Sequence, residues 1–254
     1  MARPASTPDG PAAAETAAAP VAPVAAVGTA IQHEVRFSAS LLRRWGVLLA
    51  AIGGMVVLPL WGFAEIGEEI REREAIFFDA PILRFAHGLA SARLDRMFLW
   101  VTDVGYLHGV VPLDFVLVAA LTLTRRFREA TFAAIALGGS ALINMATKVV
   151  FARGRPSLWD SIAPETTFSF PSGHAMGSAT LACVLIALSW HSRWRWLVAV
   201  PAVVFVGAVG FSRVYLGVHY PSDIVAGWAA ATAWAVAAYV VVYRLSGRPW
   251  VAAG

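Results

Sequence analysis

Residues able to do chemistry gather in three short stretches of the second half of this 254-residue chain. In the first stretch, Lys148 and Arg155 stand seven positions apart and Pro156 follows directly. This spacing predicts two cations on one side of a helix, across two turns, with the proline stopping the helix. Cations at a helix end can also simply extend their charged tips into water. Together with Arg153 they make three cations, which on an outer membrane face would be unusual and so indicate an anion site.

The second stretch is Pro171-Ser-Gly-His174, and an apolar run follows it at once. Ser172 is of the residue type that caps helix starts, and Gly173 lets a ligand approach the backbone closely. Free amides at a helix start bind anions. For Ser-Gly alone a capped helix without a ligand is the favoured explanation, but His174 beside the same turn shifts the balance towards an acid or base at an anion site.

The third stretch runs from Ser212 and Arg213 to Asp223, and Pro221 within it marks the start of another apolar run. His219 and Asp223 are four residues apart across that start, close enough for the carboxylate to accept a ring N–H. Such a bond fixes the tautomer and leaves the other ring nitrogen free. His219 alone could be an ordinary interfacial residue, but the three stretches together indicate a reactive centre.

A metal site is the alternative for these residues, since His174, His219 and Asp223 could form a two-histidine, one-carboxylate set. A divalent metal ion would be repelled by the three cations that converge on the same place, Lys148, Arg155 and Arg213. We therefore predict neither a metal nor a cofactor.

The composition requires a membrane, because 58% of the residues are hydrophobic and only 14% are charged. Soluble domains carry roughly 25% charged residues, so a soluble fold and a wholly disordered chain are both excluded. A single cysteine, Cys183, excludes an intramolecular disulfide framework. The net charge is +4, but the basic residues stand beside apolar runs, which indicates membrane topology rather than a nucleic-acid partner.

Six apolar runs approach the roughly 20 residues that a membrane span needs. Five contain no charge, and the second is interrupted by Asp114, which would face the bundle interior; the runs are 45–64, 104–124, 130–147, 175–190, 196–212 and 224–243. We predict an all-α integral membrane bundle of about six transmembrane helices. Five glycines in these runs favour close helix packing: Gly138, Gly139, Gly177, Gly207 and Gly210.

Arginine clusters predict the orientation of the bundle. They precede the first run, separate the second from the third and the fourth from the fifth, and follow the sixth. All four positions fall on one side, which the positive-inside rule makes cytoplasmic. Both termini are then cytoplasmic, and the three stretches lie at the outer rim of a plasma membrane of bacterial type.

The remaining segments complete the predicted organisation. Residues 1–35 are an Ala/Pro-rich disordered tail, 36–248 form the membrane domain and 249–254 a short C-terminal tail. Within the outer loop 65–97, Asp79 could cap a helix with Pro81 just inside it. Apolar residues then recur at helical spacing, at Ile82, Phe85, Ala86 and Leu89. An amphipathic helix on the membrane surface and a small soluble cap both fit this pattern.

In this order the three stretches resemble the signature of the type 2 phosphatidic acid phosphatase superfamily. Its pattern is Lys-x6-Arg-Pro, then Pro-Ser-Gly-His, then Ser-Arg-x5-His-x3-Asp, and every fixed position is present here. Arg153 also matches a frequent Gly-Arg-x-Arg-Pro variant, except that Ala152 replaces its glycine. The signature covers 148–223, and the six-span layout extends the resemblance to about 41–245.

The resemblance implies an all-helical phosphatase that works through a phosphohistidine. His219 would be the nucleophile, Asp223 would orient it, and His174 would protonate the leaving oxygen. The phosphoryl oxygens would be held by Lys148, Arg155, Arg213 and the Ser172–Gly173 turn. The implied substrate is a lipid phosphate of the phosphatidate, phosphatidylglycerophosphate or polyprenyl (undecaprenyl) diphosphate type, drawn from the surrounding membrane lipids.

Two other functions remain open from the sequence. A haloperoxidase-like protein would hold vanadate in the same pocket, although relatives of that kind are soluble. A transporter would carry its charges near the bilayer midplane, whereas here they gather at one rim. The sequence does not indicate an oligomeric state.

Overall fold

The computed structural model describes residue 46, residue 50 and residues 53–244. The predicted tails at 1–35 and 249–254 lie outside the described residues, as does much of the first predicted span. All regular elements in the described part are helices. After a helix over 53–72 come α2 (Asp79–Gly88), α3 (Ala92–Val104), α4 (Val110–Leu123), α5 (Phe127–Phe151), α6 (Gly173–Ser189), α7 (Arg195–Tyr215) and α8 (Pro221–Arg244). The all-α prediction is thus confirmed.

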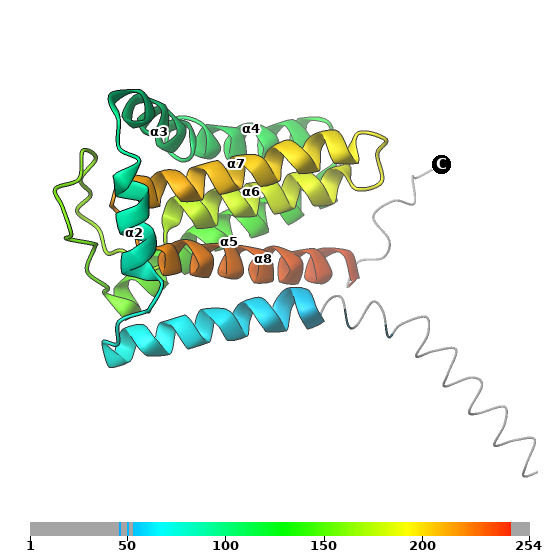
Figure 1. The fold of residues 1–254 in the computed structure, drawn as a ribbon. Helices are drawn as coiled ribbons and strands as arrows, with labels where there is room; N and C mark the ends of the chain where they lie inside the picture. The colour runs from blue at the N-terminus through cyan, green and yellow to red at the C-terminus, as the bar shows by residue number, and fades with distance from the viewer. Residues whose placement is uncertain (1–45, 47–49, 51–52, 245–254) are drawn as a thin grey trace, which may run out of the picture. The chain divides into compact units, whose positions relative to one another are not determined.

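Helices α4 to α8 run alongside one another, with α2 across one end of them (Figure 1). Within this bundle α6 is central, because it contacts α4, α5, α7 and α8. Helices α5, α7 and α8 are long and apolar enough to cross a membrane, whereas α4 and α6 are shorter apolar helices. At 25 residues, α5 spans about 38 Å at 1.5 Å per residue.

Two of the glycines in the apolar runs allow close helix contact, namely Gly139 and Gly210, whereas a Cβ at Gly138 or Gly207 would meet nothing within 4 Å, so the prediction was wrong there. A Cβ at Gly139 on α5 would lie 2.3 Å from the ring of Trp234 on α8. The indole of Trp234 also donates to the carbonyls of Ile135 and Ala136, at 3.2 and 3.0 Å. The Trp234 side chain therefore fills the space that Gly139 leaves and binds α8 to α5.

The second predicted span begins later than expected. Residues 104–109 do not continue into α4, because α3 ends at Val104 and α4 starts at Val110. A Cβ at Gly105 would lie 2.8 Å from both the carbonyl of Val101 and the side chain of Val209, so the chain turns here against α7. Helix α3 is therefore separate from α4, and it packs on α7 through the contact between Phe98 and Tyr215.

Helix α2 forms where predicted, but Asp79 does not cap it. The N-cap is Phe78, without a side-chain cap bond. Asp79 is buried and instead accepts hydrogen bonds from the backbone N–H and the hydroxyl of Ser222, at 2.9 and 2.6 Å. The helix is amphipathic, and its buried face carries Leu83 and Ala86. Of the predicted stripe only Ala86 is buried, whereas its other members, Ile82, Phe85 and Leu89, are exposed.

Candidate active site

The cations of the first stretch do not share one helix as predicted. Helix α5 ends at Phe151, and Ala152 adopts a left-handed conformation with φ of 44°. Lys148 stays in the last turn, where its ammonium donates to the carbonyl of Phe168. Arg155 lies beyond the helix, in the loop that leads to α6. A left-handed residue reverses the chain direction, so Arg155 reaches the site from the loop rather than from the helix face.

Arg155 nevertheless contacts His219. Its Nη1 donates to the carbonyl of Val218 at 2.6 Å and lies 3.1 Å from His219 Nε2. Its Nε donates to the carbonyl of Thr167 at 2.7 Å. A guanidinium can only donate, so Nε2 acts as an acceptor and its lone pair faces the cation.

His219 and Asp223 form the predicted pair across the start of α8, which begins at Pro221 as expected. The distance from His219 Nδ1 to Asp223 Oδ2 is 3.4 Å, and the imidazole is only 1% exposed. The hydroxyl of Ser169 donates to the same Oδ2, and the backbone N–H of Tyr220 does so at 2.9 Å. Asp223 is thereby fixed from three sides, with its carboxylate turned to the ring.

Burial lowers the pKa of His219 to about 4. The bond to Asp223 and its charge oppose this shift, while the cationic Arg213 and Arg155 add to it. The imidazole is therefore neutral at physiological pH. A neutral ring with its Nδ1 turned to a carboxylate keeps an electron pair at Nε2, the pair that a nucleophile uses, and in this structure that pair accepts a hydrogen bond from Arg155.

The start of α6 is capped as predicted. The side chain of Ser172 accepts from the N–H of Ala175 at 3.4 Å. The N–H of Ser172 donates to the carbonyl of Asp223 at 3.1 Å, which joins this turn to α8. A Cβ at Gly173 would lie 3.1 Å from Asn144 Oδ1, so a larger residue would crowd the turn.

His174 follows this turn, and its ring lies against Tyr106 with the centroids 4.8 Å apart. Its imidazole interacts electrostatically with four other candidate residues: Lys148, Arg155, Arg213 and His219. The structure thus brings all three predicted stretches to one end of the bundle.

Arg213 is the most deeply buried of the cations, at 1% exposure. Its two terminal nitrogens donate to the hydroxyl of Thr102 and to the carboxylate of Glu165. Its Nε has no hydrogen-bond partner within the described residues. A buried donor without a partner is costly, so this N–H is available to an incoming anion.

Glu165 is a site residue that no sequence motif indicated. Its carboxylate binds Arg155 at 2.5 Å and also Arg213. Burial alone would raise the pKa of Glu165, but the two guanidinium groups outweigh it and hold the pKa below its usual range. An ionised carboxylate therefore bridges the two arginines that were expected to bind phosphoryl oxygens.

Arg153 does not join the anion site with the other cations. Its Nη1 donates to Asp223 Oδ1 at 2.5 Å and its Nη2 to Asp79 Oδ2 at 2.8 Å. The same guanidinium lies over the ring of Tyr220, 4.0 Å from the centroid. Arg153 therefore bridges Asp223 on α8 and Asp79 on α2.

Among residues 53–244, no group of three or more histidine, cysteine or acidic side chains is placed to hold a metal ion. Asp114 stands apart from the site. One of its carboxylate oxygens is buried without a partner in the described structure, beside a cavity of about 110 Å³ between α4, α5 and α6.

Comparison with known proteins agrees with the fold and the motifs. Residues 129–246, which include all three stretches, match the family model described as PAP2 superfamily. Phosphatidylglycerophosphatase B of Bacillus subtilis is 30% identical over 155 residues, 59% of this chain and 76% of that protein. Undecaprenyl-diphosphatase of Sulfolobus acidocaldarius is 28% identical over 159 residues, 60% of this chain and 73% of that protein.

Among solved structures, a transmembrane PAP2 type phosphatidylglycerolphosphate phosphatase from Bacillus subtilis superposes with a TM-score of 0.64 at 25% identity. The match covers 72% of this chain and 94% of that one. The fold is that of an integral membrane phosphatase, and the relatives support a hydrolase of phosphoric esters. The chain belongs to the PAP2 superfamily.

Proposed function

We propose that this protein removes a phosphoryl group from a membrane lipid through a phosphohistidine formed at His219. The observation that carries the proposal is the buried, neutral imidazole, whose Nδ1 faces Asp223 while its Nε2 faces Arg155. A second arginine, Arg213, reaches the same centre through Glu165.

In the first step His219 Nε2 attacks phosphorus, forming an N–P bond as the P–O bond to the lipid breaks. His174 donates a proton to the departing oxygen, and Asp223 stabilises the positive charge that develops on the ring. Water then attacks phosphorus and gives a proton to His174 as the N–P bond breaks, which releases phosphate and restores both histidines. Charge spreads over the phosphoryl oxygens in both steps, and preset donors lower the barrier. The proposed donors are Lys148, Arg155, Arg213 and the turn at Ser172–Gly173.

The proposed substrate class is a lipid phosphomonoester or diphosphate. The names of the relatives support phosphatidylglycerophosphate and undecaprenyl diphosphate as candidates, and phosphatidate shares the same reacting group. The cations of the site would neutralise the phosphoryl charge without a divalent metal. We propose this metal-independent reaction on the strength of the Arg155 and Arg213 geometry.

We further propose that the site faces outward and that both termini are cytoplasmic, as the arginine clusters indicate. A cysteine introduced in the 159–165 loop of a Cys183→Ser background should react with an impermeant thiol reagent in intact cells. A cysteine beside Arg126 should not react. The reverse pattern of labelling would contradict this orientation and place the substrate in the inner leaflet.

Phosphate release by the purified protein tests the function directly. Phosphatidate, phosphatidylglycerophosphate and undecaprenyl diphosphate should be compared with and without a chelator and with and without vanadate. We expect turnover of at least one lipid, unchanged by chelation and inhibited by vanadate, together with acid-labile covalent label from ³²P substrate that His219→Gln lacks. No release from any lipid would contradict the function, and loss on chelation with rescue by a divalent ion would contradict the mechanism.

A further inference from the structure

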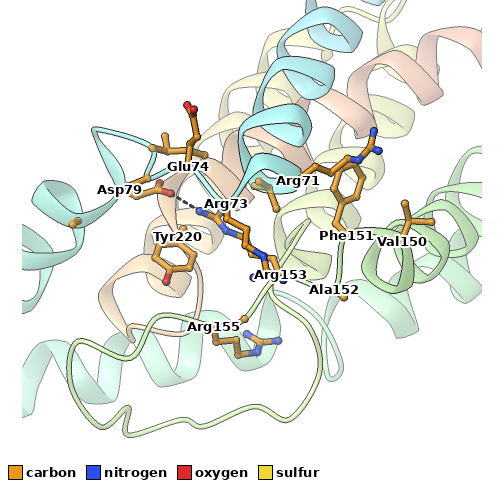
Figure 2. A pocket seen from close by; sticks show the side chains of 15 residues that line it. Arg71, Arg73, Glu74, Asp79, Val150, Phe151, Ala152, Arg153, Arg155 and Tyr220 are labelled. Atoms are coloured by element: carbon orange, nitrogen blue, oxygen red, sulfur yellow. Dashed lines mark hydrogen bonds and ion pairs between the residues drawn. The ribbon is translucent and has the colours of Figure 1, made fainter.

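A cavity of about 700 Å³ lies beside the catalytic end of the bundle (Figure 2). Its walls are the end of the 53–72 helix, the segment before α2 and the end of α5. Arg71, Arg73 and Arg153 all line it, and Figure 2 shows Arg71 beside Phe151 with Arg73 and Arg153 in the centre of the view. Arg155, which belongs to the signature and is a proposed phosphoryl donor, also lines the cavity, whereas Arg71 and Arg73 belong to no signature motif.

Two of these arginines have charges that the protein does not neutralise. Arg153 is occupied by Asp79 and Asp223, and Arg155, the fourth arginine of the wall, is occupied by Glu165. Arg71 and Arg73 are exposed, and within the described residues neither has an ion pair or a side-chain hydrogen bond. Besides Asp79, the one acid among the lining residues is Glu74, so the open part of the wall is cationic.

The backbone at Arg73 is a second, independent sign that its side chain is used. Arg73 has a φ of 60°, in the left-handed region, directly after the 53–72 helix. The turn is closed by the N–H of Glu74, which donates to the carbonyl of Glu69 at 2.9 Å. Glycine adopts this conformation at the least cost and is the usual residue at such a helix end. An arginine held in a strained conformation points to a role for its guanidinium.

The other part of the wall is apolar and continues towards the lipid-facing side of α5. Ile70, Val150 and Phe151 line the cavity, and Val150 is 72% exposed on a helix long enough to span a membrane. A ligand that satisfies both parts needs an anionic group and hydrocarbon chains. Arg155 lines this cavity and also contacts His219, so the cavity adjoins the centre. A lipid that carries only a phosphodiester has neither the phosphomonoester nor the diphosphate of the proposed substrate, so such a ligand is distinct from the group that reacts at His219.

We propose that the cavity binds an anionic phospholipid that is not the substrate. Its phosphodiester is bound by Arg71 and Arg73, and its acyl chains lie against Ile70 and Val150. A phosphodiester oxygen and a guanidinium form strong, charge-assisted hydrogen bonds. Removing one guanidinium should weaken binding about tenfold, which corresponds to about 1.4 kcal/mol.

Lipid retention by the full-length purified protein tests this site. Native mass spectrometry from detergent micelles should show tighter binding of phosphatidylglycerol than of phosphatidylcholine. The double variant Arg71→Gln/Arg73→Gly should weaken phosphatidylglycerol binding about a hundredfold if the two contributions add. Glycine suits the backbone at 73, so the thermal midpoint of this variant should not fall and a folding defect would not be the cause.

Two controls separate the site from its alternatives. Arg84→Gln removes an exposed arginine from α2, outside the cavity, and should bind phosphatidylglycerol as the unaltered protein does. His219→Ala should also retain it, whether or not the proposed reaction is correct. Unchanged binding in the double variant, or equal losses in Arg84→Gln or His219→Ala, would overturn the proposal. Displacement of the lipid by an equal concentration of inorganic phosphate would do so too, because it would assign the cavity to a free anion.

Discussion

The carboxylate of Glu165 forms an ion pair with the guanidinium of Arg213, which is the residue expected to bind a phosphoryl oxygen. The same carboxylate pairs with Arg155. A carboxylate and a phosphate offer similar planar or near-planar pairs of oxygens to an arginine. Glu165 therefore occupies, in the described structure, part of the place that a substrate anion would take.

Replacing Glu165 with glutamine should strengthen binding of anions at the site. The neutral amide no longer competes for the two arginines and no longer repels a dianion. We expect the inhibition constants for vanadate and inorganic phosphate to fall about tenfold, or about 1.4 kcal/mol. Asp160→Asn is the matched control, because it removes one exposed negative charge from the same loop. An unchanged or higher vanadate constant in Glu165→Gln would show that the carboxylate does not compete with anions.

The two histidines should respond differently to the leaving group. His219→Ala removes the proposed nucleophile, so we expect no turnover of any substrate. A general acid is typically worth about 10²–10⁴-fold, and it matters only where the departing oxygen needs a proton. His174→Ala should lose a factor of that order on a lipid phosphate, whose alkoxide is a poor leaving group. It should lose much less on an activated aryl phosphate.

Steady-state rates on both substrates and covalent labelling with ³²P check these roles. In His174→Ala the label should accumulate with the aryl substrate if the same residue also activates water. Equal losses on the two substrates would remove His174 from the acid role. Label retained by His219→Ala would place the nucleophile elsewhere.

Arg153 should matter for stability through the carboxylates it neutralises. Arg153→Gln leaves Asp79 and Asp223 buried without their cation, and breaking a buried pair costs about 3–5 kcal/mol. Adding Asp79→Asn should recover part of this loss, because a neutral amide needs no counter-charge. Thermal unfolding in micelles measures the effect, with Arg126→Gln as the control at the more exposed Arg126–Glu129 pair. A double variant less stable than Arg153→Gln alone would show that Asp79 does not depend on Arg153.

The charge state of His219 predicts an unusual titration. Its pKa of about 4 lies below the ordinary histidine value of 6.5, so the ring should stay neutral throughout mild acidification. Between these two values the unfolded chain binds more protons than the fold, and stability should therefore decrease as the pH falls through that window. Histidine-selective ¹⁵N NMR in micelles measures the pKa, with His219→Gln assigning the signal. A midpoint above pH 6 would mean that the ring is more hydrated than its burial indicates.

Local patterns in the sequence predicted the parts of the site that depend on local geometry. A capping serine and a helix-starting proline act within one turn, and both Ser172 and Pro221 stand where expected. The pairing of His219 with Asp223 follows from their spacing of four residues. The same reasoning was wrong for Arg155, because the left-handed Ala152 ends α5 before the second turn that the spacing required.

Contacts between distant segments could not be predicted from one sequence. Asp79 has the residue type of an N-cap, yet its partner Ser222 lies 143 positions away. Glu165 is one acid in an irregular loop. Only the fold brings it into contact with Arg213, which lies 48 residues away in the sequence. Arg153 was grouped with the cations beside it, whereas burial next to two carboxylates determines what it binds.

The bond from Asp79 to Ser222 has a consequence for exchanging parts between relatives. Helix α2 meets the catalytic helix α8 through this acid, and Arg153 completes the junction from the loop after α5. A chimera that receives a foreign 65–97 segment would therefore keep its catalytic geometry only if the donor supplies an acid at position 79. Grafting of the surface helices is thus restricted by a single side chain that lies outside every motif of the signature.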